Sequence, residues 1–447
     1  MNIILLSGGS GKRLWPLSNE VRSKQFLKIL RKEDGSHESM LQRMHRMILE
    51  IDPDATITIA TSENQVTSIY SQLGDQIGIS VEPCRRDTFP AIALASAYLC
   101  EIDHVDPEEV VIVCPVDPYV ELPYFRMLGR LCEQAEKGEA NLCLMGIEPT
   151  YPSERYGYIL PETKDPISRV LSFKEKPDVS TARSYIHKGA LWNAGVFAFR
   201  LGYVLDIAKD VFGTASYRDL FNHYEDCKKI SFDYAVVEKE SEIQVMRFAG
   251  IWKDLGTWNT LTETMGTEIT GNASAPLCEN THVINELQIP LIALGVKNLA
   301  IAATPDGILV ADKGHSDKLK DYVSDQRPMY EERFWGEYKV LDYRIDTDGC
   351  NHLTKHLIIA SGRHISYQRH TRRTEMWTVV DGTGTFVINE EVIPVTRGDY
   401  VCVKPGTWHA IAAKTELHVI EVQVGDALIE EDIERQDWDW ENMRPVK

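Results

Sequence analysis

Glycines and basic side chains gather near the start of the chain, in the stretch GGSGKR at residues 8–13. This stretch follows an apolar run at residues 3–6 that has the pattern of a first β-strand. Glycines let backbone amides approach a ligand because no Cβ stands in the way, and a helix beginning beyond them would add its positive end. Lys12, Arg13 and Lys24 supply positive charge. The stretch matches neither GxxxxGK[ST] nor GxGxxG, so these residues alone predict only a turn that can bind an anion.

A second group of candidate residues lies near the C-terminus, where Gln368, His370, Glu375 and His409 are found. Residues two apart on a strand share a face, so we expect His370 and Arg372 to point into a barrel where Glu375 and His409 converge. A guanidinium cannot deprotonate to bind a divalent cation, and its charge repels one. Two alternatives follow from the residues: a divalent metal site, or a structural barrel that holds no metal.

The elements that must position these two groups differ between the halves of the chain. In the first half, strand-like runs at residues 2–6, 56–61 and 110–115 alternate with a helix-like stretch at 37–51 and an apolar run at 91–100. This rhythm of strand, crossover and strand predicts an α/β domain with a parallel sheet covered by helices.

The pattern changes near residue 270 and again near residues 326–332. Short apolar segments at 289–294, 299–303 and 308–311 predict a small β unit. Beyond it almost every run is strand-like and glycines mark the turns, which predicts an all-β barrel or sandwich. We therefore expect three parts, with limits at residues 1–270, 271–326 and 327–447.

Composition and charge exclude several classes of protein. Forty-eight basic and 67 acidic side chains give a net charge of −19, which would repel a nucleic-acid backbone. The nine cysteines form no CxxC pair, which favours reduced thiols in the cytoplasm. Neither a basic leader nor an apolar run of membrane-spanning length is present. We predict a cytoplasmic protein that binds neither nucleic acid nor membranes.

The longer string GGSGKRLWPLSNEVRSKQFLKI, residues 8–29, resembles the signature of the sugar-phosphate nucleotidyltransferases, in particular the mannose-1-phosphate guanylyltransferases. Ser23 stands where that family has proline, and we expect this change to loosen the turn before Lys24 slightly. Six further stretches follow in the family's order: residues 82–91, 115–117, 156–159, 173–177, 192–197 and 252–258. The resemblance covers roughly residues 1 to 265 and implies a Rossmann-like α/β domain.

This resemblance implies a reaction in which a sugar 1-phosphate oxygen attacks the α-phosphorus of a nucleoside triphosphate and expels pyrophosphate. Two anions must meet, so carboxylates that hold Mg²⁺ and cations around the triphosphate would supply most of the rate. The implied metal ligands are Asp117 and Asp254, and magnesium usually takes only one or two protein carboxylates. Arg13 and Lys24 would grip the triphosphate and complete the predicted catalytic set.

The resemblance also implies which residues contact the two substrates. The predicted nucleotide-binding residues are Leu6, Gly8, Gly9, Gly11, Lys12, Arg13, Glu82, Arg85, Asp87, Thr88 and Pro90. The predicted sugar-phosphate-binding residues are Gly157, Tyr158, Glu175, Lys176 and Asn193, with Lys176 on the phosphate. Asp87 and Phe89 depart from the family's pattern in the segment that lines the base pocket, so the base and the sugar stay open.

The second half resembles a cupin and, together with FWGEY at residues 334–338, the isomerase half of bifunctional mannose-6-phosphate isomerase and guanylyltransferase proteins. That family uses a second histidine where this chain has Arg372. Four candidate ligands for a divalent metal remain: Gln368, His370, Glu375 and His409. Whether this half isomerises mannose 6-phosphate stays open.

The function that we expect is transfer of GMP from GTP to mannose 1-phosphate, giving GDP-mannose for nucleotide-sugar and surface polysaccharide synthesis, by an enzyme that forms a homo-oligomer. One alternative keeps the reaction with another hexose- or heptose-1-phosphate or another triphosphate, and a second adds isomerase activity. A third is a non-catalytic sensor of nucleotide sugars. Retention of both Asp117 and Asp254 argues against the sensor, because a protein that only binds has no need of two metal-holding aspartates.

Overall fold

The computed structural model describes the whole chain except residues 10–11, 20, 266, 325–326, 347–348, 430–431, 441 and 446–447. The described chain divides into two compact units. One consists of residues 1–66, 72–268 and 311–321, and the other of residues 67–71, 269–310 and 322–447. Within the described ranges, no helix is both long enough and apolar enough to cross a membrane.

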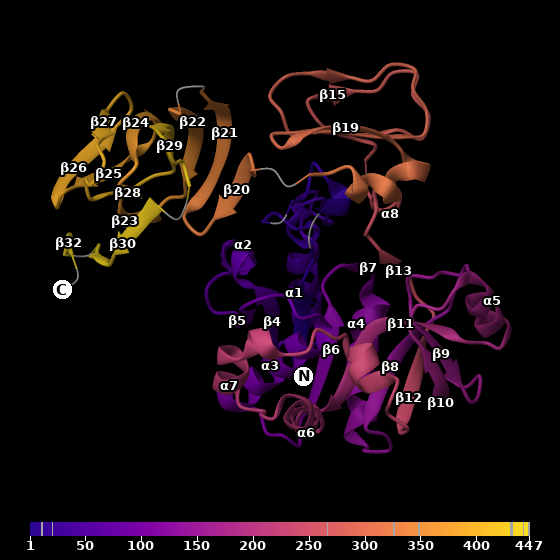
Figure 1. The fold of residues 1–447 in the computed structure, drawn as a ribbon. Coiled ribbons are helices and arrows are strands. Elements are labelled where there is room, and N and C mark those ends of the chain that lie inside the picture. Colours follow the sequence, from indigo (N-terminus) through magenta and orange to yellow (C-terminus); the bar gives the residue numbers. More distant parts are fainter. Residues whose placement is uncertain are drawn as a thin grey trace. The chain divides into compact units, whose positions relative to one another are not determined.

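Nine strands form the central sheet of the first unit (Figure 1): β1 (Asn2–Ser7), β4 (Thr56–Ser62), β5 (Gly78–Glu82), β6 (Val110–Pro115), β8 (Leu142–Ile147), β9 (Tyr158–Pro161), β10 (Ile167–Lys174), β11 (Leu191–Arg200) and β12 (Ile243–Phe248). Their order is β5-β4-β1-β6-β11-β8-β12-β10-β9. Strands β5, β4, β1 and β6 run parallel, as the alternation of apolar runs predicts, and β11 lies antiparallel between β6 and β8. Parallel strands end at the same edge, so the segments after β1, β5 and β6 meet there.

Short pairings and helices complete the first unit. The short strand pairs are β2 (Leu30–Arg31) with β3 (His37–Glu38), and β7 (Pro118–Val120) with β13 (Trp252–Asp254). The α-helices are α1 (Met40–Ile51), α2 (Glu63–Leu73), α3 (Thr88–Glu101), α4 (Leu122–Glu136), α5 (Val179–His187), α6 (Leu201–Phe212), α7 (Tyr217–Asn222) and α8 (Trp258–Thr262). The shorter helices are η1 (Lys12–Leu14), η2 (Lys24–Phe26), η3 (Tyr224–Asp226), η4 (Asp233–Val237, a π-helix) and η5 (Lys313–Asp321).

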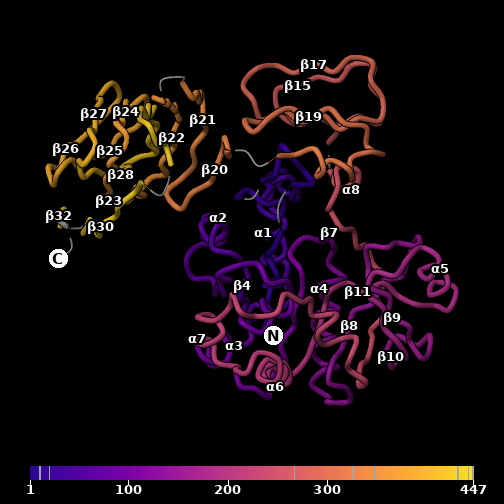
Figure 2. Tube along the Cα trace, in the orientation of Figure 1, coloured from indigo at the N-terminus to yellow at the C-terminus, as the bar shows by residue number. Residues whose placement is uncertain are grey.

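Helices cover both faces of the parallel part of the sheet. Helix α3 packs on β1, β4 and β5 and on α6 and α7, and the trace in Figure 2 shows these three helices together. Side chains alternate along β6: Val111 and Val113 join the core cluster with Phe89 of α3, whereas Cys114 lies against Tyr124 of α4. Strands buried on both faces need nearly continuous apolar sequence, which explains the uninterrupted runs in this half.

Six short strands form a stacked arrangement in the second unit: β14 (Ile269–Gly271), β15 (Ala273–Ser274), β16 (His282–Asn285), β17 (Leu291–Ile292), β18 (Leu299–Thr304) and β19 (Gly307–Asp312). Strands β14, β16 and β18 pair in parallel, as do β15 and β17. Successive turns of the chain therefore stack on one another around Val283, Ala293 and Ile301. The apolar segments predicted short strands here, but not their parallel stacking.

The C-terminal part of the second unit is built from two antiparallel sheets. Their strands are β20 (Tyr330–Arg333), β21 (Gly336–Ile345), β22 (Asn351–Ile359), β23 (His364–His370), β24 (Arg373–Asp381), β25 (Thr383–Ile388), β26 (Glu391–Thr396), β27 (Tyr400–Val403), β28 (His409–Ala413), β29 (Leu417–Gly425) and β30 (Ile433–Gln436), followed by the pair β31 (Trp438–Asp439) and β32 (Arg444–Pro445). One sheet has the order β20-β21-β22-β29-β24-β27 and the other β26-β25-β28-β23-β30. Trp377 of the first sheet packs edge-on against Phe386 of the second, with ring centroids 5.5 Å apart, so the core lies between the sheets. This part is all-β, as predicted.

Candidate active site

Two aspartates from distant parts of the sequence meet at one ammonium group in the first unit. The Nζ atom of Lys24 lies 2.8 Å from Oδ2 of Asp117 and 3.3 Å from Oδ1 of Asp254. Burial lowers the pKa of Lys24, but the two carboxylates raise it more, so that its net pKa lies above the ordinary value. The structure thus brings Asp117 and Asp254, the two predicted metal ligands, together at one ammonium group.

A short strand pair brings these aspartates together. Asp117 lies between β6 and β7, and Asp254 is the last residue of β13. In the antiparallel pairing of β7 with β13, Asp254 stands opposite Pro118, the residue after Asp117. A Cβ at Gly256 would lie 3.0 Å from both carboxylate oxygens of Asp254. A side chain at this position would therefore crowd the carboxylate, and glycine avoids that contact.

Ser23 is linked by hydrogen bonds to the glycine turn and to Gln65. Its side chain is fully buried, and its hydroxyl donates to the carbonyl of Gly9 at 3.3 Å and accepts from Nε2 of Gln65 at 3.0 Å. The φ angle of Ser23 is −66°, the value that a proline ring would impose. The buried serine thus keeps the backbone conformation that a proline would impose and adds a hydrogen bond to the turn, and the slight loosening stays a prediction.

A pocket of about 300 Å³ opens beside the glycine turn at the carboxyl edge of the parallel strands. Predicted nucleotide-binding residues line it, together with the predicted metal ligand Asp117: Leu6, Gly8, Gly9, Glu82, Arg85, Asp87 and Thr88. Nη2 of Arg85 donates to the carbonyl of Gly9 at 3.4 Å. Asp87 precedes α3 with a φ of +69°, and its carboxylate caps the helix by accepting from the backbone N–H of Thr88 at 2.8 Å.

Phe89 does not contact this pocket. Its side chain is fully buried and stacks on Phe212 with ring centroids 5.1 Å apart. The ring of Phe232 packs against it at a tilt. Pro90 is also buried in α3 and lies outside the pocket lining. The prediction that Phe89 sits where base selectivity is set is therefore wrong: it is a core residue, and Asp87 is the departure that faces the pocket.

Lys12 and Arg13, two of the predicted cations, directly follow the glycine turn along the chain. Lys12 is partly exposed and Arg13 exposed, and both belong to η1. The short helix η5 packs against η1 and so supports it. Gly11 falls outside the described residues.

The predicted sugar-phosphate residues gather around a half-buried carboxylate, that of Asp233, which the sequence analysis missed. Nζ of Lys176 lies 2.6 Å from Oε1 of Glu175, and Nδ2 of Asn193 donates to Oδ1 of Asp233 at 2.7 Å. Burial, and then the charge of Glu175, raise the pKa of Asp233 to about 7. Asp233 begins the π-helix η4, a local irregularity that is common at functional sites.

Gly157 is required by the close approach of Glu175. A Cβ at this position would lie 2.5 Å from Oε2 of Glu175 and 2.8 Å from a ring carbon of Phe173. The neighbouring Tyr158 is fully buried, and its hydroxyl donates to the carbonyl of Ser153 at 3.1 Å. The side chain of Tyr158 thus holds the preceding loop and does not point to a ligand, so only its backbone remains available for the predicted role.

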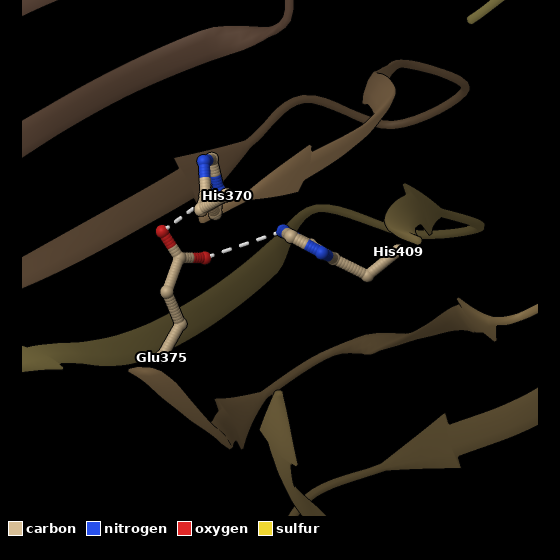
Figure 3. Close-up of side chains that lie close together, drawn as sticks. All are labelled: His370, Glu375 and His409. Atoms are coloured by element: carbon tan, nitrogen blue, oxygen red, sulfur yellow. Dashed lines mark ion pairs between the residues drawn. The ribbon is translucent and has the colours of Figure 1, made fainter. Parts of the chain in front are cut away.

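In the second unit, three candidate metal ligands meet in the interior of the two-sheet region. Figure 3 shows the carboxylate of Glu375 between the two imidazoles: Oε1 lies 3.1 Å from Nε2 of His370, and Oε2 lies 3.4 Å from Nε2 of His409. All three side chains are buried and offer ligand atoms within 4.8 Å of one another. Gln368 stands opposite His409 in the pairing of β23 with β28, and together with Glu375 it lines a small cavity. Burial raises the pKa of Glu375, but the two histidines lower it further, and it lies well below the ordinary value.

Arg372 points away from this cluster, contrary to the sequence prediction. The carboxylate of Asp432 accepts hydrogen bonds from the backbone N–H groups of Thr371 and Arg372, both at 3.0 Å, in a turn between β23 and β24. This turn breaks the two-residue alternation of the strand. The Arg372 side chain is 52% exposed and pairs with Asp426 at 3.0 Å, so its charge does not stand in the metal position.

The guanidinium inside the cluster belongs to Arg373. Its Nε donates to Oε1 of Glu375 at 2.9 Å, and its Nη2 lies 3.2 Å from Nε2 of His370. Gln423 donates to the same oxygen of Glu375 at 3.1 Å. Sequence reasoning missed both residues, although Arg373 stands two positions before Glu375 on one strand, a spacing that could have placed them on the same face.

Comparisons with known proteins show which families the two halves of the chain match. Residues 2–270 match the family described as nucleotidyl transferase, and residues 321–438 match the family described as mannose-6-phosphate isomerase C-terminal. A Salmonella montevideo protein named mannose-1-phosphate guanylyltransferase is 32% identical over 97% of this chain and 98% of its own length. The alginate biosynthesis protein AlgA of Pseudomonas aeruginosa is 30% identical over 97% of this chain and 95% of its own. A crystal structure from Thermus thermophilus, described as mannose-1-phosphate geranyltransferase, has a TM-score of 0.61 and 28% identity, and covers 72% of this chain and 97% of that one.

Arg372 and Arg373 should differ sharply in their contribution to stability. Arg373→Met would leave Glu375 buried without its cation, and we expect it to lower the free energy of unfolding of the second unit by about 3–5 kcal/mol. Arg372→Met removes an exposed ion pair and should leave the melting midpoint unchanged. Calorimetric melting of both variants in a chelator checks this; similar shifts in the two would contradict the placement of these side chains.

Asp233 should make stability fall as the pH rises. Its pKa in the folded chain is raised to about 7, while an unfolded aspartate has a pKa of about 3.9. Between these values the folded chain keeps a proton that the unfolded chain has lost, so the free energy of unfolding decreases from about pH 4 to about pH 7. Asp233→Asn should flatten this slope in a pH series of denaturant unfolding. Parallel profiles for the variant and the wild type would disprove the raised pKa.

Proposed function

Because the chain belongs to the nucleotidyl transferase family, we propose that it transfers GMP from GTP to mannose 1-phosphate, giving GDP-mannose and pyrophosphate. The name of the Salmonella montevideo relative supports these substrates, and the name of AlgA supports a place in polysaccharide synthesis. The observation that carries the proposal is the meeting of Asp117 and Asp254 at one cation position beside the pocket of the glycine turn.

In this reaction an oxygen of the sugar 1-phosphate attacks the α-phosphorus of GTP. A bond forms between them, the bond from that phosphorus to the bridging oxygen breaks, and pyrophosphate leaves. Lys24 and Arg13 would neutralise phosphate charge, and the amides of the turn at Gly8 and Gly9 would donate to phosphate oxygens. Lys176 and Glu175 would hold the sugar phosphate and a sugar hydroxyl. Positioning and charge neutralisation would thus supply most of the rate.

Asp117 and Asp254 fit a magnesium ion. Both already present an oxygen to the same ammonium of Lys24, and carboxylate oxygens are the ligands that Mg²⁺ prefers. When bound there, Mg²⁺ would neutralise charge on the phosphates. Lys24 would then be released from the carboxylates to pair with phosphate oxygens.

The rival functions differ in their substrates or in whether they need the charge of Asp254. Another triphosphate or another hexose- or heptose-1-phosphate would use the same two aspartates, so only the substrate preference distinguishes it. A sensor that only binds a nucleotide sugar would not need the charge of Asp254. The predicted homo-oligomer, the cytoplasmic location and the three domains with boundaries at residues 270 and 326 remain part of this proposal.

The second unit supports an additional function, a cupin that isomerises mannose 6-phosphate with a divalent metal. The observation that favours it is the buried group of His370, Glu375 and His409, in which Oε2 of Glu375 and Nε2 of His409 face each other without a hydrogen-bond partner among the described residues. Their donor set of two imidazoles and a carboxylate suits a divalent transition metal. Arg372 lies outside the cluster, but the guanidinium of Arg373 contacts Oε1 of Glu375 and Nε2 of His370, so a metal would have to displace that guanidinium or bind at Oε2 of Glu375 and Nε2 of His409.

Asp254→Asn should fold normally and lose nearly all turnover, because it removes a metal-holding charge and not a packing contact. Pyrophosphate release with GTP and mannose 1-phosphate measures this, and Asp210→Asn, an exposed aspartate of α6, is the matched control. A panel of triphosphates and sugar 1-phosphates in the same assay identifies the preferred pair. Unchanged release by Asp254→Asn, with an unchanged melting midpoint, would exclude the proposed mechanism.

His409→Ala should abolish metal binding by the second unit. We expect the wild-type protein, loaded with Zn²⁺ or Co²⁺ and desalted, to keep a bound ion that elemental analysis detects and that the variant lacks. The loaded wild type should also interconvert mannose 6-phosphate and fructose 6-phosphate. Equal metal content in the two proteins would contradict the proposed metal site. Bound metal without conversion of mannose 6-phosphate would contradict the isomerase activity and indicate a structural metal.

A further inference from the structure

Tyr224 lies behind the nucleotide pocket, on a segment that no motif of the sequence identifies. Its hydroxyl donates to Oε2 of Glu82 at 2.7 Å. The ring is buried in a core cluster with Leu94 and Leu220, which fixes its position. Burial raises the pKa of Tyr224 above its ordinary value, so its hydroxyl stays a donor throughout the neutral range.

The segment that carries Tyr224 is fastened to the loop that forms the pocket. The guanidinium of Arg86 donates to the carbonyl of Glu225, and the backbone N–H of Ile230 donates to the carbonyl of Arg86 at 3.2 Å. The backbone N–H of Phe232 donates to Oγ1 of Thr88 at 2.9 Å. The Tyr224 hydroxyl is therefore held in register with Glu82.

Three groups besides burial act on the carboxyl of Glu82. The pKa of Glu82 is raised to about 7, and burial is the largest cause. The charge of Asp87 also raises this pKa, whereas the hydrogen bond from Tyr224 and the charge of Arg85 lower it. Glu82, Arg85 and Asp87 all line the pocket, whereas Tyr224 stands behind Glu82. Tyr224 is thus the neutral donor in a set that otherwise consists of charged groups.

The protonation state of a carboxyl decides which purine it can pair with. A carboxylate only accepts hydrogen bonds and has about four acceptor positions, so Tyr224 occupies one and leaves others for a ligand. Guanine presents two donors side by side, at N1 and at its exocyclic N2, and these match a carboxylate. Adenine presents a donor at N6 beside an acceptor at N1, and these match a protonated carboxyl.

We propose that Tyr224 is a positioning residue that makes this pocket select guanine over adenine. Its hydroxyl does so by donating a hydrogen bond to the carboxylate of Glu82. The inference rests on the proposed use of GTP and names a residue that determines it. Tyr224 does not touch the reacting atoms, so its effect falls on nucleotide recognition and not on the transfer step.

Tyr224→Phe tests this with steady-state pyrophosphate release. A hydrogen bond to a charged group is strong enough that its loss should raise KM for GTP about tenfold and lower the preference for GTP over ATP by a similar factor. The value of kcat and KM for mannose 1-phosphate should change less than about twofold. Tyr203→Phe is the matched control, because Tyr203 donates to Glu240 at 2.6 Å outside the pocket.

The pH profile separates this role from a structural one. Loss of the Tyr224 donor removes a group that favours the charged form of Glu82, so the pH below which KM for GTP rises should move upward in Tyr224→Phe. Tyr203→Phe should keep the wild-type profile. A Tyr224→Phe profile and GTP preference that coincide with the wild type would overturn the proposal.

Glu82→Gln keeps the proposal testable even if Tyr224→Phe does not fold. This variant has no carboxyl at the position, so KM for GTP should lose its pH dependence between about pH 6 and pH 8. Persistence of that dependence would overturn the role of Glu82 and with it that of Tyr224.

Failure of the proposed function has a different signature. If the wild type releases no pyrophosphate from GTP, the transferase proposal fails first. Equilibrium binding of GDP and ADP to the wild type and to Tyr224→Phe then still tests the inference, since a preference for GDP that Tyr224→Phe reduces supports it and an equal preference in both proteins overturns it.

Discussion

The first unit depends on bringing two like-charged carboxylates to the same point. Asp117 and Asp254 would repel each other in an empty site, and the ammonium of Lys24, 2.8 Å from one and 3.3 Å from the other, compensates for that repulsion. A cation is therefore part of the folded site, because the backbone holds the two carboxylates where a positive charge is needed between them. The pairing of β7 with β13 supplies that arrangement.

The sheet places the other parts of the site around this point. The glycine turn follows β1, Glu82 ends β5 and Asp117 follows β6, so three parallel strands deliver their ends to one edge. The segment from Tyr224 to Asp233 then runs behind both substrate regions, with Tyr224 bonded to Glu82 and Asp233 bonded to Asn193. The proposed base and sugar sites thus share one supporting segment, which the chain's order alone does not reveal.

Sequence reasoning recovered what depends on local pattern or on a dense motif. The α/β and all-β halves followed from apolar periodicity, and the meeting of Asp117 with Asp254 followed from the resemblance to a family. It failed where long-range contacts decide. Asp432 holds the turn that directs Arg372 outward, and Phe89 enters the core because Phe212 stacks on it and Phe232 packs against it at a tilt.

Buried and half-buried polar residues outside motifs were the least predictable. Asp233 lies in a run that has the pattern of an ordinary helix, and Tyr224 has no neighbour in the sequence that indicates a role. Each acquires its importance from one partner far along the chain, Asn193 or Glu82. The partners of Ser23, which stands where the family has proline, were also not predictable, since only the structure shows that Gln65 bonds to it.

The most direct test of the central claim is a crystal structure with Mn²⁺ and a GTP analogue whose bond between the α- and β-phosphates cannot be cleaved. We expect the anomalous signal of manganese between the carboxylates of Asp117 and Asp254, with Lys24 moved from them to a phosphate oxygen. Manganese bound elsewhere, with Lys24 still between the two aspartates and the triphosphate in place, would contradict the account.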